Sequence, residues 1–145
     1  MIDSNIIRKF FLILSMLIGL KYNAQKNDRK LEISFQDHFK GDTVSLGIGK
    51  CEMFKNKILT SREIGFAGIT ITLYELNKIV ISENGNIILE KKCNINLNKK
   101  LNLNLELNNR KKVLKVNINT GKYIGLNKDN NSFELRQLKV PFEYE

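Results

Sequence analysis

The chain has 145 residues, of which 42% are hydrophobic, and it carries 24 Lys+Arg against 15 Asp+Glu, a formal net charge of +9. Two cysteines and one histidine have no metal-ligand spacing, so we expect no metal site and no cofactor. The basic excess favours acidic partners weakly and names none of them. Ile, Asn and Lys number 18, 19 and 19, and all three have AT-rich codons, so genome composition by itself could enrich surface Asn and Lys.

Residues 1–25 have the order of a secretory signal peptide. Arg8 and Lys9 form a short basic region, and the apolar run FFLILSMLIGL follows before the chain turns polar. A helix of this run is only about 16 Å long, roughly half the thickness of a bilayer core, which is too short for a transmembrane span. The alternative is a hydrophobic N-terminal helix of the mature fold.

We expect cleavage near Ala24 or Gln25. Residues 26–145 then form a single exported domain, periplasmic or extracellular, with 21 Lys+Arg and 14 Asp+Glu and a net charge of +7. This length is sufficient for a hydrophobic core without further support, and no later segment is apolar enough to span a membrane.

Apolar and polar residues alternate with a period of two through the mature chain, which predicts β-strands. Clear examples are Leu31–Phe35, Val44–Ile48 and Ile69–Tyr74, and turn formers such as Glu83–Asn86 separate the strands. About nine short strands predict two packed antiparallel sheets, an immunoglobulin-like or jelly-roll-like β-sandwich with no helix longer than about two turns. A small closed β-barrel is the alternative. Pro141, the only proline, predicts an edge at the last strand.

Asparagine and aliphatic residues alternate between positions 94 and 119. Turns at residues 98–100 and 109–112 predict a meander of strands 87–97, 101–108 and 113–119. Its outer face then carries two adjacent rows of amides, which are Asn94, Asn104 and Asn117 in one row and Asn96, Asn102 and Asn119 in the other.

This amide surface is a candidate binding site for a sugar, a peptide or another strand. The alternative is that asparagine is a genome-favoured filler on a solvated sheet. Trp is absent and Tyr numbers four, so aromatic platforms for sugars are few.

The same register gathers a basic cluster at one end of the sandwich, composed of Lys91, Lys92, Arg110, Lys111 and Lys112. A polyanion or an acidic glycan surface could bind there, although Glu90 and Glu106 lie close by and turns are often simply charged. No nucleic-acid motif accompanies the cluster, so we expect no nucleic-acid partner.

Cys51 and Cys93 are the only cysteines. An even number in an exported chain favours a disulfide, and the alternative is two buried thiols. His38 lies between Asp37 and Asp42 where the first strand ends, and most histidines in such a position are turn residues.

These patterns predict a small exported, non-enzymatic binding or structural module whose partner they do not identify. One alternative is a subunit or accessory protein of an exported complex. The other is a small secreted hydrolase or lyase that uses His38, although the chain holds no GxSxG, HExxH or phosphate-loop motif.

Overall fold

The protein is an all-β fold over the residues that its computed structural model describes, 28–98 and 100–144. The predicted signal peptide lies outside these residues. The strands are β1 (Arg29–Phe35), β2 (Lys40–Ile48), β3 (Cys51–Thr60), β4 (Ile69–Tyr74), β5 (Lys78–Glu83), β6 (Asn86–Lys92), β7 (Leu101–Leu107), β8 (Arg110–Val116), β9 (Tyr123–Asp129) and β10 (Ser132–Leu138). The helix η1 (Glu75–Asn77) is a single 3-10 turn. The all-β prediction is therefore confirmed for the described chain, in which no helix is long and apolar enough to cross a bilayer.

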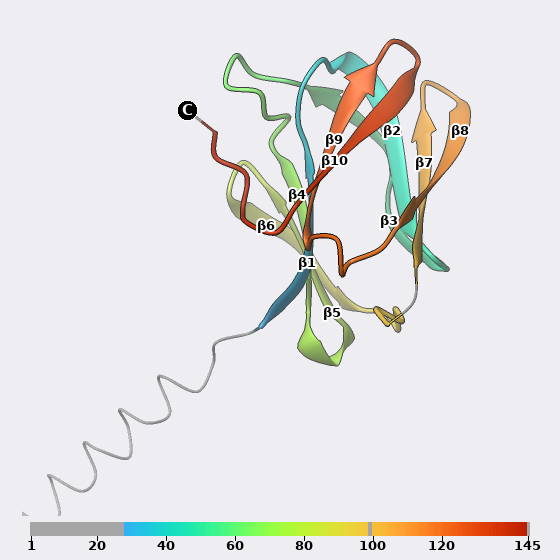
Figure 1. Cartoon of the computed structure of the whole chain (residues 1–145). Coiled ribbons are helices and arrows are strands. Elements are labelled where there is room, and N and C mark those ends of the chain that lie inside the picture. Colours follow the sequence, from blue (N-terminus) through green and yellow to red (C-terminus); the bar gives the residue numbers. More distant parts are fainter. Residues whose placement is uncertain (1–27, 99, 145) are drawn as a thin grey trace, which may run out of the picture.

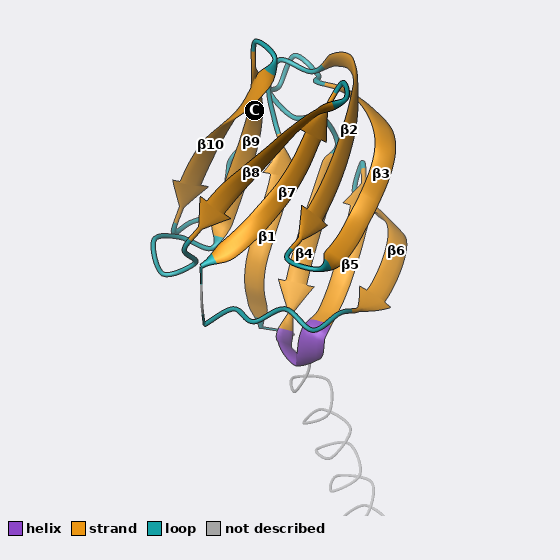
Figure 2. Ribbon diagram, turned by 90° about the vertical axis from the view of Figure 1, so that its right-hand side faces the viewer, coloured by secondary structure: helices purple, strands orange, loops and turns teal. Residues whose placement is uncertain are grey.

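The strands form two sheets that face each other across a common core (Figures 1 and 2). The six-stranded sheet has the order β10-β9-β1-β4-β5-β6, and the four-stranded sheet has the order β3-β2-β7-β8. Both sheets end in free edges, so the alternative of a closed barrel is wrong.

The six-stranded sheet is mixed, which corrects the prediction of two antiparallel sheets. Strand β1 runs antiparallel to β4 but parallel to β9, with Ile33 opposite Ile124 and Phe35 opposite Leu126. Parallel neighbours need a crossover connection, and here most of the chain lies between β1 and β9. The pairing thus joins the first and the ninth strand, which alternation within each strand cannot reveal.

The core is built from the inward positions of both sheets. Strand β7 shows the predicted alternation clearly, since Leu101, Leu103, Leu105 and Leu107 are buried while Asn102 and Asn104 are exposed. Phe35 is fully buried, and its ring lies 5.8 Å from that of Phe39 and 5.6 Å from that of Phe54. Such edge-on and tilted aromatic contacts add to the burial of apolar area.

The predicted meander of residues 87–119 is wrong, because β6 and β7 belong to different sheets. Strand β6 pairs with β5 and ends at Lys92, and residues 93–98 then cross to the four-stranded sheet, where β7 pairs with β2. The alternation continues through this crossing because Cys93, Ile95 and Leu97 pack against the core. Alternation with a period of two therefore identified which side chains of this segment are buried, but it did not show that the segment is one continuous strand.

The β7–β8 turn is tighter than predicted. Asn108 and Asn109 form a two-residue turn with φ of +48° and +67°, and positive φ at both central positions is typical of a type I′ hairpin. Asn104 consequently lies opposite Val113 rather than Asn117. The register is shifted by four positions, an even number, so the inward and outward assignments on β7 and β8 remain correct.

Many asparagines have a conformational role. Eight residues other than glycine have positive φ in the described chain, and six of them are asparagine: Asn56, Asn77, Asn84, Asn108, Asn109 and Asn130. Asparagine tolerates the left-handed region better than most residues with a side chain. Turn and bulge geometry thus accounts for part of the asparagine content.

Side-chain contacts close both long sides of the sandwich. At the side formed by β3 and β6, Cys51 and Cys93 lie at disulfide-bonding distance with Cα atoms 6.3 Å apart, and Lys57 forms a 3.0 Å ion pair with Glu83. At the side formed by β8 and β10, Lys112 Nζ donates to Ser132 Oγ at 2.7 Å and to the Phe133 carbonyl at 3.0 Å. The predicted cysteine pairing is confirmed in this geometry.

The chain after β10 leaves the sheet. The predicted edge at the last strand is confirmed, because β10 is an edge strand of the six-stranded sheet, but Pro141 lies beyond its end at Leu138 and not within it. Residues 139–144 instead return toward the outer face of the six-stranded sheet, where Tyr144 Oη accepts a hydrogen bond of 2.9 Å from Gln36 Nε2.

Replacing Gly121 with alanine should lower the free energy of unfolding by about 1–3 kcal/mol, the usual cost of forcing extra atoms into a packed site. A Cβ at Gly121 would overlap the backbone of Leu138, which cannot rotate away as a side chain can. Urea denaturation followed by fluorescence measures the change. Serine at the exposed Asn119 is the control, and equal stability of the Gly121 variant and the parent would contradict the close approach.

Candidate functional site

A hollow of about 390 Å³ opens on the outer face of the four-stranded sheet. It crosses all four strands, since Ser45 and Gly47 come from β2, Lys55 from β3, Asn104 from β7, and Val113 from β8, while the β2–β3 turn forms one wall. Concave sites with a few placed polar groups are the usual locations for ligands. Geometry therefore selects this hollow as one candidate site.

Small side chains on β2 create the floor. Gly47 is an outward position that lies opposite Asn104 of β7 and Glu52 of β3, and it has no side chain to fill the space between them. Asn104 Nδ2 donates a 2.8 Å hydrogen bond to the Gly49 carbonyl, which holds the amide against the turn. The floor thus combines one fixed, uncharged amide with apolar lining residues such as Leu46 and Phe54.

The rim is basic. Lys50, Lys55 and Lys111 line the hollow, and none of their side chains forms an ion pair or hydrogen bond with another described residue. Glu52 and Glu106 also line it, so the rim carries both signs with an excess of lysine. Val113, with 56% of its surface exposed, adds an apolar contact.

The structure separates the six predicted asparagines. Asn102 and Asn104 lie on β7 and are exposed, and only Asn104 reaches the hollow. The other four lie outside the strands: Asn94 and Asn96 in the crossing segment, and Asn117 and Asn119 after β8. Asn96 Oδ1 accepts from Asn98 N at 3.0 Å and Asn117 Oδ1 accepts from Asn119 N at 3.1 Å, so two of these amides stabilise local turns. The predicted rows of amides do not exist.

The predicted basic cluster is also divided. Lys91 and Lys92 end β6 at one edge of the six-stranded sheet, whereas Arg110, Lys111 and Lys112 begin β8 at the opposite side of the molecule. Lys91 Nζ bonds the Glu52 carbonyl, and Lys112 is held by β10. Of these five basic residues, only Lys111 lines the hollow and has a side chain that is not held by another described residue.

The sequence patterns did not identify Lys50 and Lys55 as candidate site residues. One pattern nevertheless indicated a hollow in this part of the chain. The GIGK stretch, residues 47–50, contains Gly49 and Lys50, which form the turn between β2 and β3. Ser45 and Gly47 are the outward positions next to that turn, and two small residues on one face of a strand indicate a depression in the sheet surface. The depth of the depression depends on neighbours from β7 and β8.

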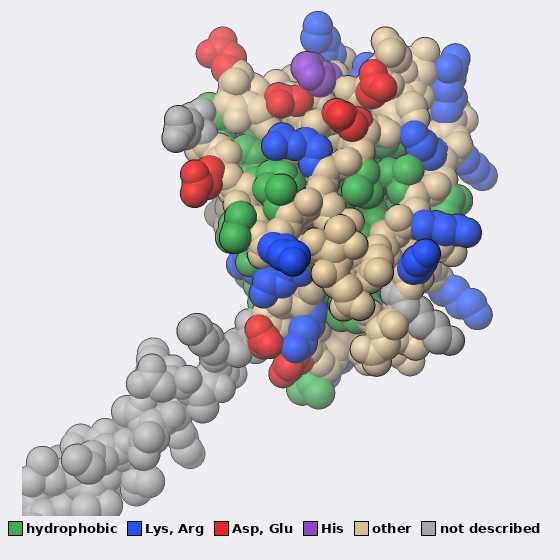
Figure 3. Space-filling view, in the orientation of Figure 1, with side chains coloured by type: hydrophobic (Ala, Val, Ile, Leu, Met, Phe, Trp, Pro, Cys, Tyr) green, Lys and Arg blue, Asp and Glu red, His purple; other side chains and the backbone are tan. Residues whose placement is uncertain are grey.

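His38 lies at one end of the sandwich, next to a buried polar network. It is exposed and has φ of +72°, and the only histidine is visible among acidic and basic side chains in Figure 3. It forms no hydrogen bond or ion pair with the described residues. Ser61 nearby donates to the Gln36 carbonyl at 2.5 Å and accepts from Phe39 N at 3.0 Å, so its hydroxyl is committed to the backbone.

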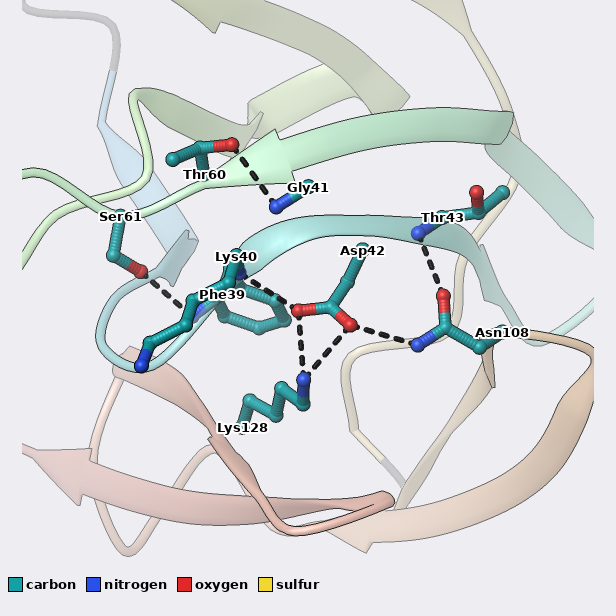
Figure 4. A network of polar contacts seen from close by, with 9 residues as sticks. All are labelled: Phe39, Lys40, Gly41, Asp42, Thr43, Thr60, Ser61, Asn108 and Lys128. Carbon is teal, nitrogen blue, oxygen red and sulfur yellow. Dashed lines mark hydrogen bonds and ion pairs between the residues drawn. The ribbon is translucent and has the colours of Figure 1, made fainter.

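The network is centred on Asp42, which is only 6% exposed (Figure 4). Lys128 Nζ lies 2.8 and 2.9 Å from the two carboxylate oxygens, and Asn108 Nδ2 donates to Oδ1 at 2.7 Å. The backbone N–H of Lys40 donates to Oδ2 at 2.8 Å. Because Lys128 is on β9 and Asp42 on β2, the network joins the two sheets.

Burial by itself raises the pKa of the Asp42 carboxyl, but the hydrogen bonds from Lys128, Lys40 N and Asn108, with the charge of Lys128, outweigh it. The net effect holds this pKa below its ordinary value of 3.8. Asp42 is therefore a charged structural group, fully engaged by its neighbours.

Within residues 28–98 and 100–144, no three side chains of His, Cys, Asp or Glu gather closely enough to hold a metal ion. Comparison of the chain with known protein families, with curated proteins and with solved structures finds no match. The functional argument therefore depends on the geometry of the chain itself.

Proposed function

We propose that the protein is an exported, non-enzymatic binding module that attaches to an acidic partner through the hollow of the four-stranded sheet. The observation that carries this proposal is the rim of Lys50, Lys55 and Lys111, three ammonium groups without a partner in the described chain around the fixed amide of Asn104. The lining holds four lysines, Lys112 included, against two glutamates, so the hollow has a net positive charge that attracts the opposite charge. An acidic protein surface or an acidic glycan fits this chemistry.

Export is part of the proposal. The basic, apolar and polar order of residues 1–25 supports it, and a cysteine pair at bonding distance is compatible with an oxidising compartment. We also propose a β-sandwich for the two facing sheets. An immunoglobulin-like or jelly-roll-like class would have to accommodate the parallel β1–β9 pair, because both classes are otherwise antiparallel.

An enzyme built on His38 would have to take its nucleophile from a side chain other than Ser61 or Asp42. A hydrolase needs a base in hydrogen-bonding reach of its nucleophile or of a water that it activates. His38 has no such partner, and the nearby Ser61 and Asp42 are occupied by structural hydrogen bonds. The other alternative, a subunit of an exported complex, is compatible with the same basic rim, which would then contact another subunit.

Replacing Lys50, Lys55 and Lys111 together with glutamine should weaken binding to heparin about tenfold, because three exposed charge contacts of about 0.5 kcal/mol each sum to that ratio. Isothermal titration at low ionic strength measures the affinity. Heparin serves as a defined polyanion, and rising salt should reduce the difference between variant and parent.

The matched control removes the same charge elsewhere, by replacing Lys92, Lys100 and Lys139 with glutamine. These lysines are exposed and lie outside the hollow. The control should retain most of the affinity of the parent. Equal losses in the two triple variants would show that net charge alone determines binding, and the hollow would then lose its role.

A further inference from the structure

A second cavity, of about 440 Å³, lies on the other side of the molecule. Its floor is the end of β1 and the exposed side of β10, and residues 138–144 form one wall. The C-terminal segment therefore encloses a space over the six-stranded sheet, opposite to the basic hollow.

Aromatic rings gather beside this cavity. Phe142 and Tyr144 line it, and the ring of Phe66 lies 4.8 Å from that of Tyr144 at an interplanar angle of 30°. The Phe142 ring lies 6.5 Å from the Tyr144 ring, and the Arg136 guanidinium lies 5.4 Å from the centre of the Phe142 ring. All three rings are partly exposed, so part of their surface remains available for contact.

The polar groups of the cavity have unused hydrogen-bonding capacity. Gln36 is 2% exposed, and its Oε1 is the one buried side-chain oxygen or nitrogen of the described chain that lacks a hydrogen-bond partner. This oxygen lies against Gly125 of β9, beneath the cavity, so it is not one of the groups that a ligand contacts. The carboxylates of Asp37 and Glu143 also line the cavity, and neither forms a hydrogen bond or an ion pair with described residues.

We propose that this cavity binds a neutral pyranose sugar, free or as a unit of a longer glycan. The C–H face of the sugar packs on the partly exposed rings of Phe142 and Tyr144. Its hydroxyl groups donate to the carboxylates of Asp37 and Glu143 and accept from the guanidinium of Arg136.

The mixture of groups selects this ligand class. Two carboxylates beside one guanidinium disfavour a polyanion, which the basic hollow accepts. An apolar ligand would leave the Asp37 and Glu143 carboxylates desolvated and unpaired. A sugar hydroxyl is both donor and acceptor, so one ligand satisfies the carboxylates and the guanidinium together. This site and the basic hollow lie on different sheets, and either proposal stands if the other fails.

Composition gave no sign that aromatic rings would gather at one place. The chain has no Trp and few Tyr, but folding brings Phe66, Phe142 and Tyr144 together from two segments far apart in sequence. Local density of aromatic rings matters for stacking, and overall abundance does not measure it.

The test is a titration of the full-length, disulfide-bonded protein, labelled with ¹⁵N, with methyl glycosides of glucose, galactose, mannose and N-acetylglucosamine. At least one glycoside should shift the backbone amide signals of Asp37, Gly65 and Tyr144 at concentrations up to tens of millimolar. Tetrasaccharides of the same sugars distinguish the source, because a gain in affinity over the glycoside indicates a glycan chain and equal affinity indicates a single unit.

Replacing Tyr144 with alanine should weaken binding about tenfold, since one aromatic contact is worth about that ratio. Phenylalanine at the same position keeps the ring and should retain most of the affinity. Glutamine at Lys111, on the opposite sheet, should leave it unchanged. The proposal is overturned if no glycoside shifts these signals, or if the shifts persist at full affinity in the Tyr144→Ala variant while circular dichroism shows an intact fold.

Discussion

Replacing Asp42 with asparagine should lower the free energy of unfolding by about 2–3 kcal/mol, one of the two largest effects that we expect. The change leaves the partly buried Lys128 ammonium without its counter-charge, and removing one member of a buried pair is costly because the other charge stays desolvated. Asparagine keeps the shape of the side chain and one acceptor oxygen, so the loss of stability measures the contribution of the negative charge. Urea denaturation at neutral pH measures it.

The pH dependence of this effect has a definite sign. The pKa of Asp42 in the folded protein is below its ordinary value of 3.8, so the folded state holds the proton less tightly than the unfolded chain does. The resulting stabilisation is fully present well above pH 3.8 and is lost as the pH falls through the folded pKa. The difference in stability between parent and Asp42→Asn should therefore narrow below pH 3.8.

The exposed Asp129 is the matched control for this experiment. Its replacement with asparagine should change stability by less than about 0.5 kcal/mol, as surface substitutions usually do. A double-mutant cycle with Lys128→Met then isolates the pair, and the double variant should lose less than the sum of the two single losses. Additive losses would show that Asp42 and Lys128 do not stabilise one another.

Removing the disulfide, by replacing Cys51 and Cys93 with alanine, should cost about 3–4 kcal/mol according to the chain-entropy account of a closed loop of this length. The two cysteines are 42 positions apart, and their bond joins β3 of one sheet to the chain just after β6 of the other. Without it, the unfolded chain gains conformational freedom and this side of the sandwich retains only weaker contacts. Chemical denaturation of both proteins under oxidising conditions measures the loss.

Reduction of the parent protein is the internal control for this prediction. Dithiothreitol should lower the stability of the parent to nearly that of the double alanine variant and should leave the variant unchanged. Mass spectrometry without reduction should show the parent 2 Da lighter than its dithiol form, the mass of the two hydrogens that leave on bond formation. Two thiols that alkylate freely in the native protein would contradict the bond.

Both predictions concern contacts that join the two sheets. Asp42 and Lys128 connect β2 to β9 at one end, whereas the cysteine pair connects the β3–β6 side. Cys51 also lines the basic hollow, and its carbonyl lies near Gly47 on the floor. Loss of the disulfide is therefore expected to disturb the hollow more than loss of the Asp42 charge does.

The sequence by itself determined which side chains are buried in most strands. Alternation identified the inward leucines of β7. It also identified the buried side chains of residues 93–98, although these residues form no strand. Burial is a local consequence of the pleat, because successive side chains point to opposite faces whatever the strand pairs with. The cysteine pairing was also predictable, since the chain has only two cysteines.

Only the tertiary structure decided which strands are neighbours, and with them the candidate sites. The parallel β1–β9 pair and the passage of the chain between sheets after Lys92 depend on contacts between distant segments, which no local pattern encodes. The hollow around Gly47 exists because β7 lies beside β2, and the cavity at Gln36 exists because the C-terminal segment returns to β1. Free energy gained by burying both sheet faces together selects these neighbours, so the sites could be read only from the folded chain.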